Sequence, residues 1–150
     1  MGRGWNRILL PIKFAKRLPA AELRLASDLA RTHRARIILL HVVRLSPAVS
    51  ADAGLSARYC VEAEQDARIK LAKLARTRLK GFKVETCVEV GDPARTIVKI
   101  AERLRADLVI IATHNRGGIR RFLLGSVAEQ VVRRCPCALL TIRPAGRGAA

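Results

Sequence analysis

Continuous apolar runs alternate along this chain with stretches in which apolar residues recur at helical spacing. The runs at residues 7–12, 35–43, 107–112 and 138–142 have apolar side chains at most positions. Uninterrupted apolar strands of this kind are typical of parallel sheets covered on both faces. The run at 83–90 instead alternates between apolar and polar residues. It predicts a strand with one polar face, at an edge of the sheet.

Helical spacing fills the stretches between these strands. Pro19 suits the first turn of the first helix, and Gly81 marks the end of the long second helix. Asp92 is expected to cap the third helix, with Pro93 as its first residue. Residues 44–56 are small and polar and predict a loop. The expected helices cover residues 19–31, 57–80, a segment beginning at 93, and 126–134.

The predicted order of elements alternates strand and helix from the first strand to the fifth. Because crossovers between parallel strands are right-handed, this order predicts an α/β fold with an open, doubly wound parallel sheet. We expect one domain over residues 1–150, with a core at about 5–143 and a frayed tail at 144–150. Ligands of such sheets bind beyond the carboxyl ends of the strands, where the strand order reverses. The loops after the first, second and fourth strands should therefore converge on a site.

Composition agrees with this fold class. Half of the 150 residues are hydrophobic but only 3% are aromatic, which favours α/β or helical packing over a β-sandwich. No apolar run approaches the roughly 20 residues that a membrane-spanning helix needs. The first residues lack the pattern of a signal peptide. We therefore expect a cytoplasmic protein with no membrane partner.

The chain is strongly basic, with 29 Lys and Arg against 12 Asp and Glu, a net charge of +17. Such a charge indicates either an anionic partner or an arginine-rich, solvated surface. The basic residues are spread through every segment, which favours the second interpretation. Lys73, Arg76 and Lys80 in the long helix are not interleaved with aromatic residues, as a single-stranded nucleic-acid platform would require. Nucleic acid is thus possible but not the favoured partner.

The four cysteines are predicted to be buried free thiols. They are Cys60, Cys87, Cys135 and Cys137, and they form no C-x-x-C motif. Cys135 and Cys137 are too close in sequence for an ordinary mutual disulfide and make a weak metal site. His41 and His114 have no acid placed near them by spacing, so we interpret them as core or loop histidines. No metal site and no catalytic residue are predicted.

The loop after the fourth strand is the best candidate for a ligand site. It leads into Gly125 and Ser126 at the start of the last helix, an arrangement that presents backbone N–H groups to an anion. Ser126 and Glu129 also have the spacing of a capping box, so Ser126 serves either as a helix cap or as a phosphate ligand. We favour the phosphate. Arg120 and Arg121 either clamp phosphates or belong to a solvated loop.

Taken together, these segments resemble the universal stress protein family over roughly residues 5–143. The resemblance rests on the order and spacing of short motifs: Ile8-Leu-Leu-Pro-Ile12, Leu39-Leu-His-Val42, Val90-Gly-Asp-Pro93 with Ile97, Ala106-Asp-Leu-Val-Ile110, Thr113-His114, and Leu124-Gly-Ser-Val-Ala-Glu129 followed by Pro136-Cys137. It implies a five-stranded, Rossmann-like sheet of order 3-2-1-4-5, like that of the adenine nucleotide alpha hydrolases. It also implies a homodimer paired through the last strand, with Leu139, Leu140 and Ile142 at the seam.

Many members of that family bind ATP through Gly, two residues, Gly, nine residues, then Gly-Ser or Gly-Thr. Ala112 and Asn115 stand at the first two glycine positions here, whereas the nine-residue spacer and Gly125-Ser126 are intact. Asn tolerates left-handed backbone angles better than any residue except glycine. Lys13 replaces the Asp that nucleotide-binding members usually carry after the first strand. A lysine cannot accept the same hydrogen bonds, although its ammonium can reach a phosphate.

The resemblance therefore implies a stress-response module that binds ATP and regulates without efficient catalysis. It places adenine near Pro11, Ile12 and Val42, and Mg²⁺ would arrive with the phosphates. The expected nucleotide-binding residues are Pro11, Ile12, Lys13, Val42, Ala112, His114, Asn115, Arg116, Gly125, Ser126 and Val127. The alternative is a nucleotide-free interaction protein whose basic surface binds an acidic protein or nucleic acid. A slow ATPase is a weaker third hypothesis.

Overall fold

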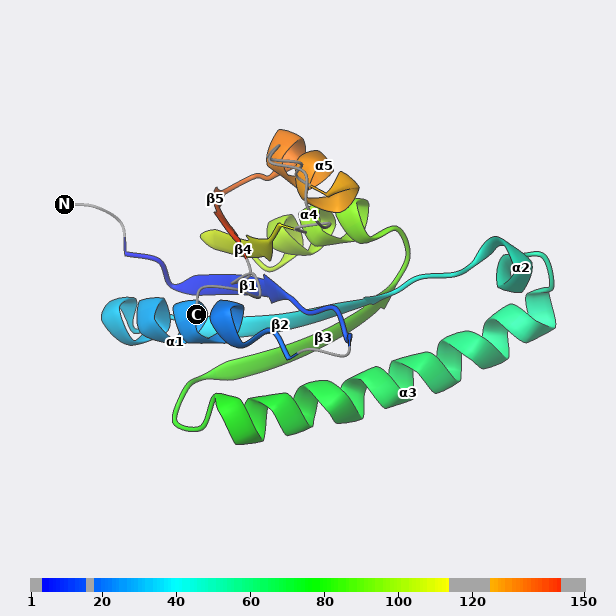
Figure 1. Ribbon diagram of the computed structural model, residues 1–150, viewed down its shortest axis with the longest axis horizontal. Coiled ribbons are helices and arrows are strands. Elements are labelled where there is room, and N and C mark those ends of the chain that lie inside the picture. The colour runs from blue at the N-terminus through cyan, green and yellow to red at the C-terminus, as the bar shows by residue number, and fades with distance from the viewer. Residues whose placement is uncertain (1–3, 16–17, 114–124, 144–150) are drawn as a thin grey trace, which may run out of the picture.

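A five-stranded parallel sheet forms the centre of the molecule (Figure 1). The computed structural model describes residues 4–15, 18–113 and 125–143. The strand order is β3-β2-β1-β4-β5, so the predicted α/β class and the order 3-2-1-4-5 are both confirmed. The strands are β1 (Arg7–Pro11), β2 (Arg36–Val43), β3 (Val84–Val90), β4 (Leu108–Ala112) and β5 (Ala138–Ile142).

Helices cover both faces of this sheet. In Figure 1, α1 and α3 lie on one side of the strands and α4 and α5 on the other. Within the described residues, no helix is both long and apolar enough to cross a membrane. The helices are α1 (Ala20–His33), α2 (Pro47–Ser50), α3 (Ala53–Arg78), α4 (Pro93–Arg103) and α5 (Ser126–Arg134).

The apolar strands are continuous because each of their two faces is buried. In β1, Ile8 and Leu10 pack into the cluster under α1 and α3, while Leu9 packs into the cluster under α4 and α5. Neighbouring β2 does the same, with Leu39 on the first face and Leu40 on the second. All five side chains are fully buried. Alternate side chains of a strand point to opposite faces, so only a sheet covered on both sides needs such a run.

The segment predicted to be a loop, residues 44–56, instead contains α2 and the start of α3. The Ser46 hydroxyl accepts a hydrogen bond from the Val49 N–H at 3.3 Å, which caps α2. The Asp52 carboxylate accepts one from the Leu55 N–H at 2.9 Å, which caps α3. Because Asp52 satisfies an N–H at that point, α3 begins at Ala53, four residues before the predicted start. It ends at Arg78 rather than at residue 80.

The other helix boundaries lie close to their predicted positions. Asp92 caps α4 by accepting a hydrogen bond from the Arg95 N–H at 3.0 Å, and Pro93 is its first residue, as predicted. Pro19 is the N-cap of α1 and not part of its first turn. That helix continues to His33 and ends where Arg34 adopts a left-handed conformation, with φ of 55°.

The two edges of the sheet are β3 and β5, so the prediction of β3 as an edge strand is confirmed. At the amino ends of the central strands, one carboxylate joins β1 to β4. Asp107 Oδ2 accepts hydrogen bonds from the backbone N–H groups of Asn6 and Arg7, each at 2.9 Å. This contact fixes where β4 begins relative to β1.

Candidate functional site

The strand order reverses between β1 and β4, and the two strands separate toward their carboxyl ends. Within the described residues, their ladder contains only the pairs Ile8–Leu108 and Leu9–Val109. On its other side, β1 pairs with β2 over five residues, and the Ile12 N–H extends the contact by donating to Leu40 O at 2.7 Å. A crevice at such a reversal is where open α/β sheets bind ligands.

Helix α5 begins at this same end of the sheet, directly after Gly125. Gly125 is the N-cap, with φ of −57° and ψ of 157°, and its carbonyl accepts the Glu129 N–H at 2.9 Å. Ser126 is therefore the first helical residue and not the cap, so the capping-box interpretation is wrong. No side chain of the described residues caps this helix. The first turn of α5 thus keeps N–H groups that an anion can accept from.

The structure describes eight of the eleven predicted nucleotide-binding residues. Lys13 and Ser126 are exposed, Ile12 is buried, and the others are half-buried. Ile12 packs on the α1/α3 face of the sheet, whereas Val42 and Val127 pack on the α4/α5 face. The predicted site residues therefore surround the carboxyl edge from both faces. His114, Asn115 and Arg116 lie outside the described residues, as do Arg120 and Arg121.

His41 has a structural contact at this edge. Its Nδ1 lies 2.8 Å from the Ile12 carbonyl oxygen, and its ring centroid is 4.7 Å from that of Phe14. The half-buried histidine thus ties β2 to the segment that follows β1, in agreement with its interpretation as a core or loop residue.

The four cysteines are free, as predicted, but they are half-buried instead of buried. Cys135 and Cys137 lie with their sulfur atoms 3.8 Å apart. Burial, and then the neighbouring Cys135, raises the pKa of the Cys137 thiol to about 12. Burial is also the main cause that raises the pKa of Cys87, followed by the charge of Glu89. Over the described residues, no three His, Cys, Asp or Glu side chains form a group that could hold a metal ion.

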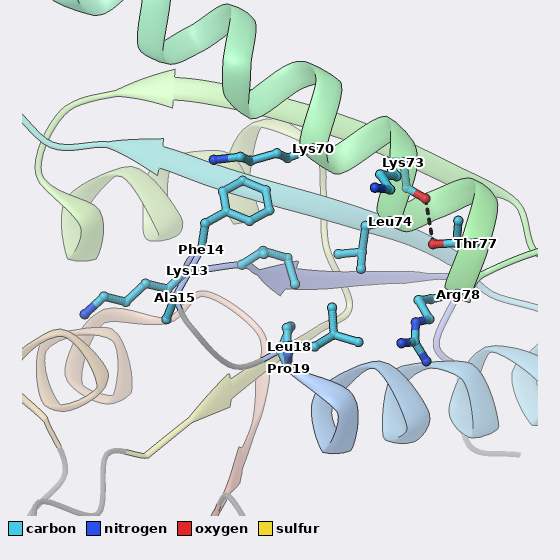
Figure 2. Close-up of a pocket in the computed structure, with 11 residues that line it drawn as sticks. Lys13, Phe14, Ala15, Leu18, Pro19, Lys70, Lys73, Leu74, Thr77 and Arg78 are labelled. Carbon is cyan, nitrogen blue, oxygen red and sulfur yellow. Dashed lines mark hydrogen bonds between the residues drawn. The ribbon is translucent and has the colours of Figure 1, made fainter.

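An additional pocket, which was not predicted from the sequence, lies between the segment after β1 and the C-terminal half of α3 (Figure 2). Its volume is about 310 Å³. Of the eight predicted nucleotide-binding residues that the structure describes, only Ile12 and Lys13 line it. A signal for it was present, because the α3 residues of its wall recur at positions i, i+3, i+4, i+7 and i+8 from Lys70. The lining residues are Ile12, Lys13, Phe14, Ala15, Leu18, Pro19, Lys70, Lys73, Leu74, Thr77 and Arg78.

Comparison with known proteins gives a consistent result. The model of the universal stress protein family matches residues 4–143. Universal stress protein MJ0531 of Methanocaldococcus jannaschii is 34% identical over 122 residues, which cover 79% of this chain and 71% of that protein. Universal stress protein MJ0577 of the same organism is 30% identical over 158 residues, covering 93% and 95%.

Solved structures share the fold. The structure of hypothetical protein MJ0577 superimposes with a TM-score of 0.79 at 26% identity, covering 95% of this chain and 99% of that one. Two more distant structures are described as complexes. One is a universal stress protein with cAMP, at 21% identity and a TM-score of 0.60 over 95% of this chain and 99% of that one. The other is the Archaeoglobus fulgidus protein with dAMP, at 20% identity and a TM-score of 0.60 over 92% and 98%.

Proposed function

This chain belongs to the universal stress protein family, and from that membership we propose that it is a regulatory protein that binds ATP at the carboxyl edge of its sheet. Binding and release of the nucleotide would switch the protein between two states that a partner distinguishes. The residues matched by the family model include the complete sheet and the start of α5, which are the elements that would form the nucleotide site.

Two features at the carboxyl edge of the sheet carry this proposal: the point where β1 and β4 stop pairing, and the start of α5. The two central strands stop pairing after Leu9 and Val109, and α5 begins with the capping position held by Gly125. A phosphate group at this point would accept hydrogen bonds from backbone N–H groups of the first helical turn, and its negative charge would be stabilised by the helix dipole. Gly125 has no side chain to block its approach.

The nucleotide would lie across this edge. Its adenine would rest near Pro11, Ile12 and Val42, and its phosphates would face Gly125, Ser126 and Val127. Ala112 follows from β4, and His114, Asn115 and Arg116 would complete the phosphate side. Mg²⁺ would be carried in by the phosphates.

Lys13 changes the nucleoside end of this site. Its ammonium has no acceptor to offer a ribose hydroxyl, and its side chain is exposed. In Figure 2 it extends away from α3. We propose that it contacts a phosphate. Charge attraction would then contribute more to nucleotide binding than hydrogen bonds to the ribose.

Two relatives of the same fold make an adenine nucleotide a reasonable ligand. One of those structures is described with cAMP and the other with dAMP. At their levels of identity they establish the shared fold, and their ligands support the proposal by analogy.

We propose further that the protein acts as a binding module and not as an enzyme, with no efficient hydrolysis of ATP. A homodimer would form through edge strand β5, where Leu139, Leu140 and Ile142 are half-buried in one copy. An unpaired edge strand offers backbone hydrogen-bonding groups to a second copy. A cytoplasmic location remains a prediction.

Titration calorimetry of the full chain with ATP, with and without Mg²⁺, tests the nucleotide site. We expect saturable binding by the native chain and loss of it in Gly125→Val, because a branched side chain covers the first N–H groups of α5. Gly125 has φ of −57°, which valine adopts without strain, so the variant should fold.

Gly54→Val is the matched control, since an added Cβ there meets only Asp52 Oδ1, at 3.5 Å. It should bind ATP like the native chain. Native-like binding by Gly125→Val would show that the phosphates lie elsewhere. An absence of ATP binding by the native chain would reject the proposed function and turn attention to partners of the basic surface.

A further inference from the structure

We propose that the pocket under the C-terminal half of α3 is a second binding site, for a small aromatic anion: one or two rings that bear a carboxylate or phosphate group. Three features of the pocket carry this inference: its apolar floor, its cationic rim and its separation from the carboxyl-edge crevice. It does not depend on nucleotide binding.

The floor of the pocket is apolar. Ile12 and Leu74 lie at its base and are 3% and 6% exposed. Phe14 forms a half-buried aromatic wall, and Leu18 is 42% exposed at the opposite side (Figure 2). Leu18 is a large apolar side chain that is exposed beside a buried floor, so covering it with a ring is favourable. An aromatic wall favours a flat ligand.

The rim of the pocket is cationic. Lys70, Lys73 and Arg78 all come from one side of α3 and surround Leu74 (Figure 2). No Asp or Glu is among the residues that line the pocket in the described ranges. Charges of one sign around a low-dielectric floor concentrate an anion of the opposite sign.

Two of these cations form no ion pair within the described residues. All Asp and Glu residues of the chain lie within the described ranges, and there neither Lys73 nor Arg78 forms an ion pair with them. Lys70 is different, because its ammonium lies 2.7 Å from Asp66 Oδ2 and 5.5 Å from the centroid of the Phe14 ring. Lys73 and Arg78 are thus the pair that would hold the anionic group, while the ring lies against Phe14 and Leu74.

The size of the pocket limits the ligand. About 310 Å³ is at the lower end of the range for small-molecule sites, roughly 300 to 1,000 Å³. That space suits a one- or two-ring acid, and the apolar floor gives no advantage to a bare inorganic ion.

The pocket lies on the other face of the sheet from α5. Ile12 and Leu74 belong to the cluster under α1 and α3, whereas Val127 packs with the cluster under α4 and α5. Of the described residues, Ile12 and Lys13 belong to both sites, and the side chain of Lys13 extends away from Leu74 (Figure 2). An aromatic anion and ATP should therefore bind at the same time.

The test uses naphthalene-1-sulfonate, a fluorescent two-ring anion, against 1-naphthylamine, which has the same two rings and is uncharged at pH 7. With the full-length chain we expect saturable binding of one sulfonate, and much weaker binding of the neutral amine. The double variant Lys73→Gln/Arg78→Gln should weaken the sulfonate by about tenfold or more, since it removes both partners of the anionic group. Arg76→Gln is the control, because Arg76 is a cation of the same helix that does not line the pocket.

A second variant tests the apolar wall of the pocket without changing a buried side chain. Leu18→Glu adds a negative charge at an exposed position of the wall and should abolish sulfonate binding while the circular dichroism spectrum stays native. The amide resonances of Phe14 and Thr77 should shift on titration of the native chain.

Four outcomes would overturn the inference: no saturable binding, equal affinity for the neutral amine, an unchanged affinity in the double variant, or an equal loss in Arg76→Gln. Displacement of the sulfonate by ATP would overturn the separation of the two sites. Gly125→Val should leave sulfonate binding intact, so a failed nucleotide site and a failed pocket give different results.

Discussion

Helices α3 and α4 cover opposite faces of the sheet and contribute to the core in very different proportions. The 11 residues of α4 bury four side chains, of which Ile97 and Ile100 are the largest. The 26 residues of α3 bury only three, Ala67, Leu71 and Leu74. All three belong to its C-terminal half, whereas its N-terminal half extends with α2 beyond the sheet (Figure 1). The length of a helix is therefore no measure of its share in the core.

Helix α3 contributes less to the core because many of its side chains, apolar ones included, are exposed to water. Leu55, Val61 and Ile69 of α3 are more than half exposed, at 53%, 55% and 68%. Ion pairs within the helix, such as Arg68 with Glu64 and Lys70 with Asp66, add about 0.3–0.5 kcal/mol each. We infer that α4 holds the fold together and that α3 presents a surface, including the wall of the pocket.

The largest loss of stability that tests the difference between α3 and α4 is expected in the core under α4. Ile100 is fully buried, so Ile100→Ala should lower the free energy of unfolding by about 2–5 kcal/mol through lost burial and the cavity left behind. The same substitution at Ile69 on α3 should change it by less than about 0.5 kcal/mol, because that side chain is 68% exposed. Urea denaturation followed by circular dichroism measures both. Equal losses would show that α3 is buried in solution, for example against a second copy.

The helix caps provide the next test. Asp92→Ala removes the side chain that accepts the Arg95 N–H and should cost about 1 kcal/mol, because α4 and the core unfold together. Asp52→Ala removes an equivalent bond at the start of α3. There the cost should be smaller, since the N-terminal half of α3 can fray without exposing a buried side chain. Hydrogen exchange should show faster exchange confined to residues 53–60. A greater global loss for Asp52→Ala would contradict the comparison.

The rates at which cysteines on the two faces of the sheet are alkylated provide a further test, and they depend on pH. Because burial raises the pKa of Cys137 to about 12, it should be alkylated by iodoacetamide more slowly than Cys60 of α3 between pH 8 and 9. The pKa of an ordinary cysteine thiol is about 9, and below that pH the protonated Cys137 contributes its full stability to the fold. That contribution is lost as the pH rises from about 9 toward 12, because the unfolded chain loses the proton first. Peptide mapping by mass spectrometry gives each rate. Faster labelling of Cys137 would show that the end of α5 opens in solution.

The smallest expected effect on stability is at the rim of the pocket. Asp66→Asn breaks an exposed ion pair and should change the free energy of unfolding by less than about 0.5 kcal/mol. It also releases Lys70 and should strengthen binding of the naphthalenesulfonate. Glu64→Gln, which releases Arg68 away from the pocket, is the matched control and should leave that binding unchanged. Weaker binding in Asp66→Asn would show that the pair with Asp66 is needed to position Lys70.

The sheet could be predicted from the sequence because its signals are local and redundant. Uninterrupted apolar strands require cover on both faces, and right-handed crossovers then leave few possible arrangements. The beginning of α3 was missed for a reason that is also local. Ser46 and Asp52 are residue types that favour both turns and N-caps, and only the observed hydrogen bonds to Val49 and Leu55 distinguish the two roles.

Of the two candidate sites, one could be predicted from local sequence and the other could not. The position of Gly125 at the start of α5 follows from a strand, a loop and a helix that are consecutive in sequence. The pocket joins residues 12–15 and 18–19 to residues of the C-terminal half of α3, and its volume depends on the distance between α3 and these residues. The stripe from Lys70 to Arg78 was visible, but a stripe of mixed charge and apolar residues is equally typical of an exposed helix.

The central position of β1 has a consequence for synthesis on the ribosome. The Asp107 carboxylate that joins β1 to β4 is 100 residues later in the chain than its partner Arg7. At about 5–20 residues per second, translation takes roughly 5–20 s to reach it after the first strand has emerged. Strand β2 follows β1 soon, but the other edge of the Ile8–Leu10 segment stays open for that whole interval. Strand β1, whose Ile8, Leu9 and Leu10 side chains are fully buried in the finished protein, thus keeps one unpaired edge available to chaperones and to neighbouring nascent chains throughout that interval.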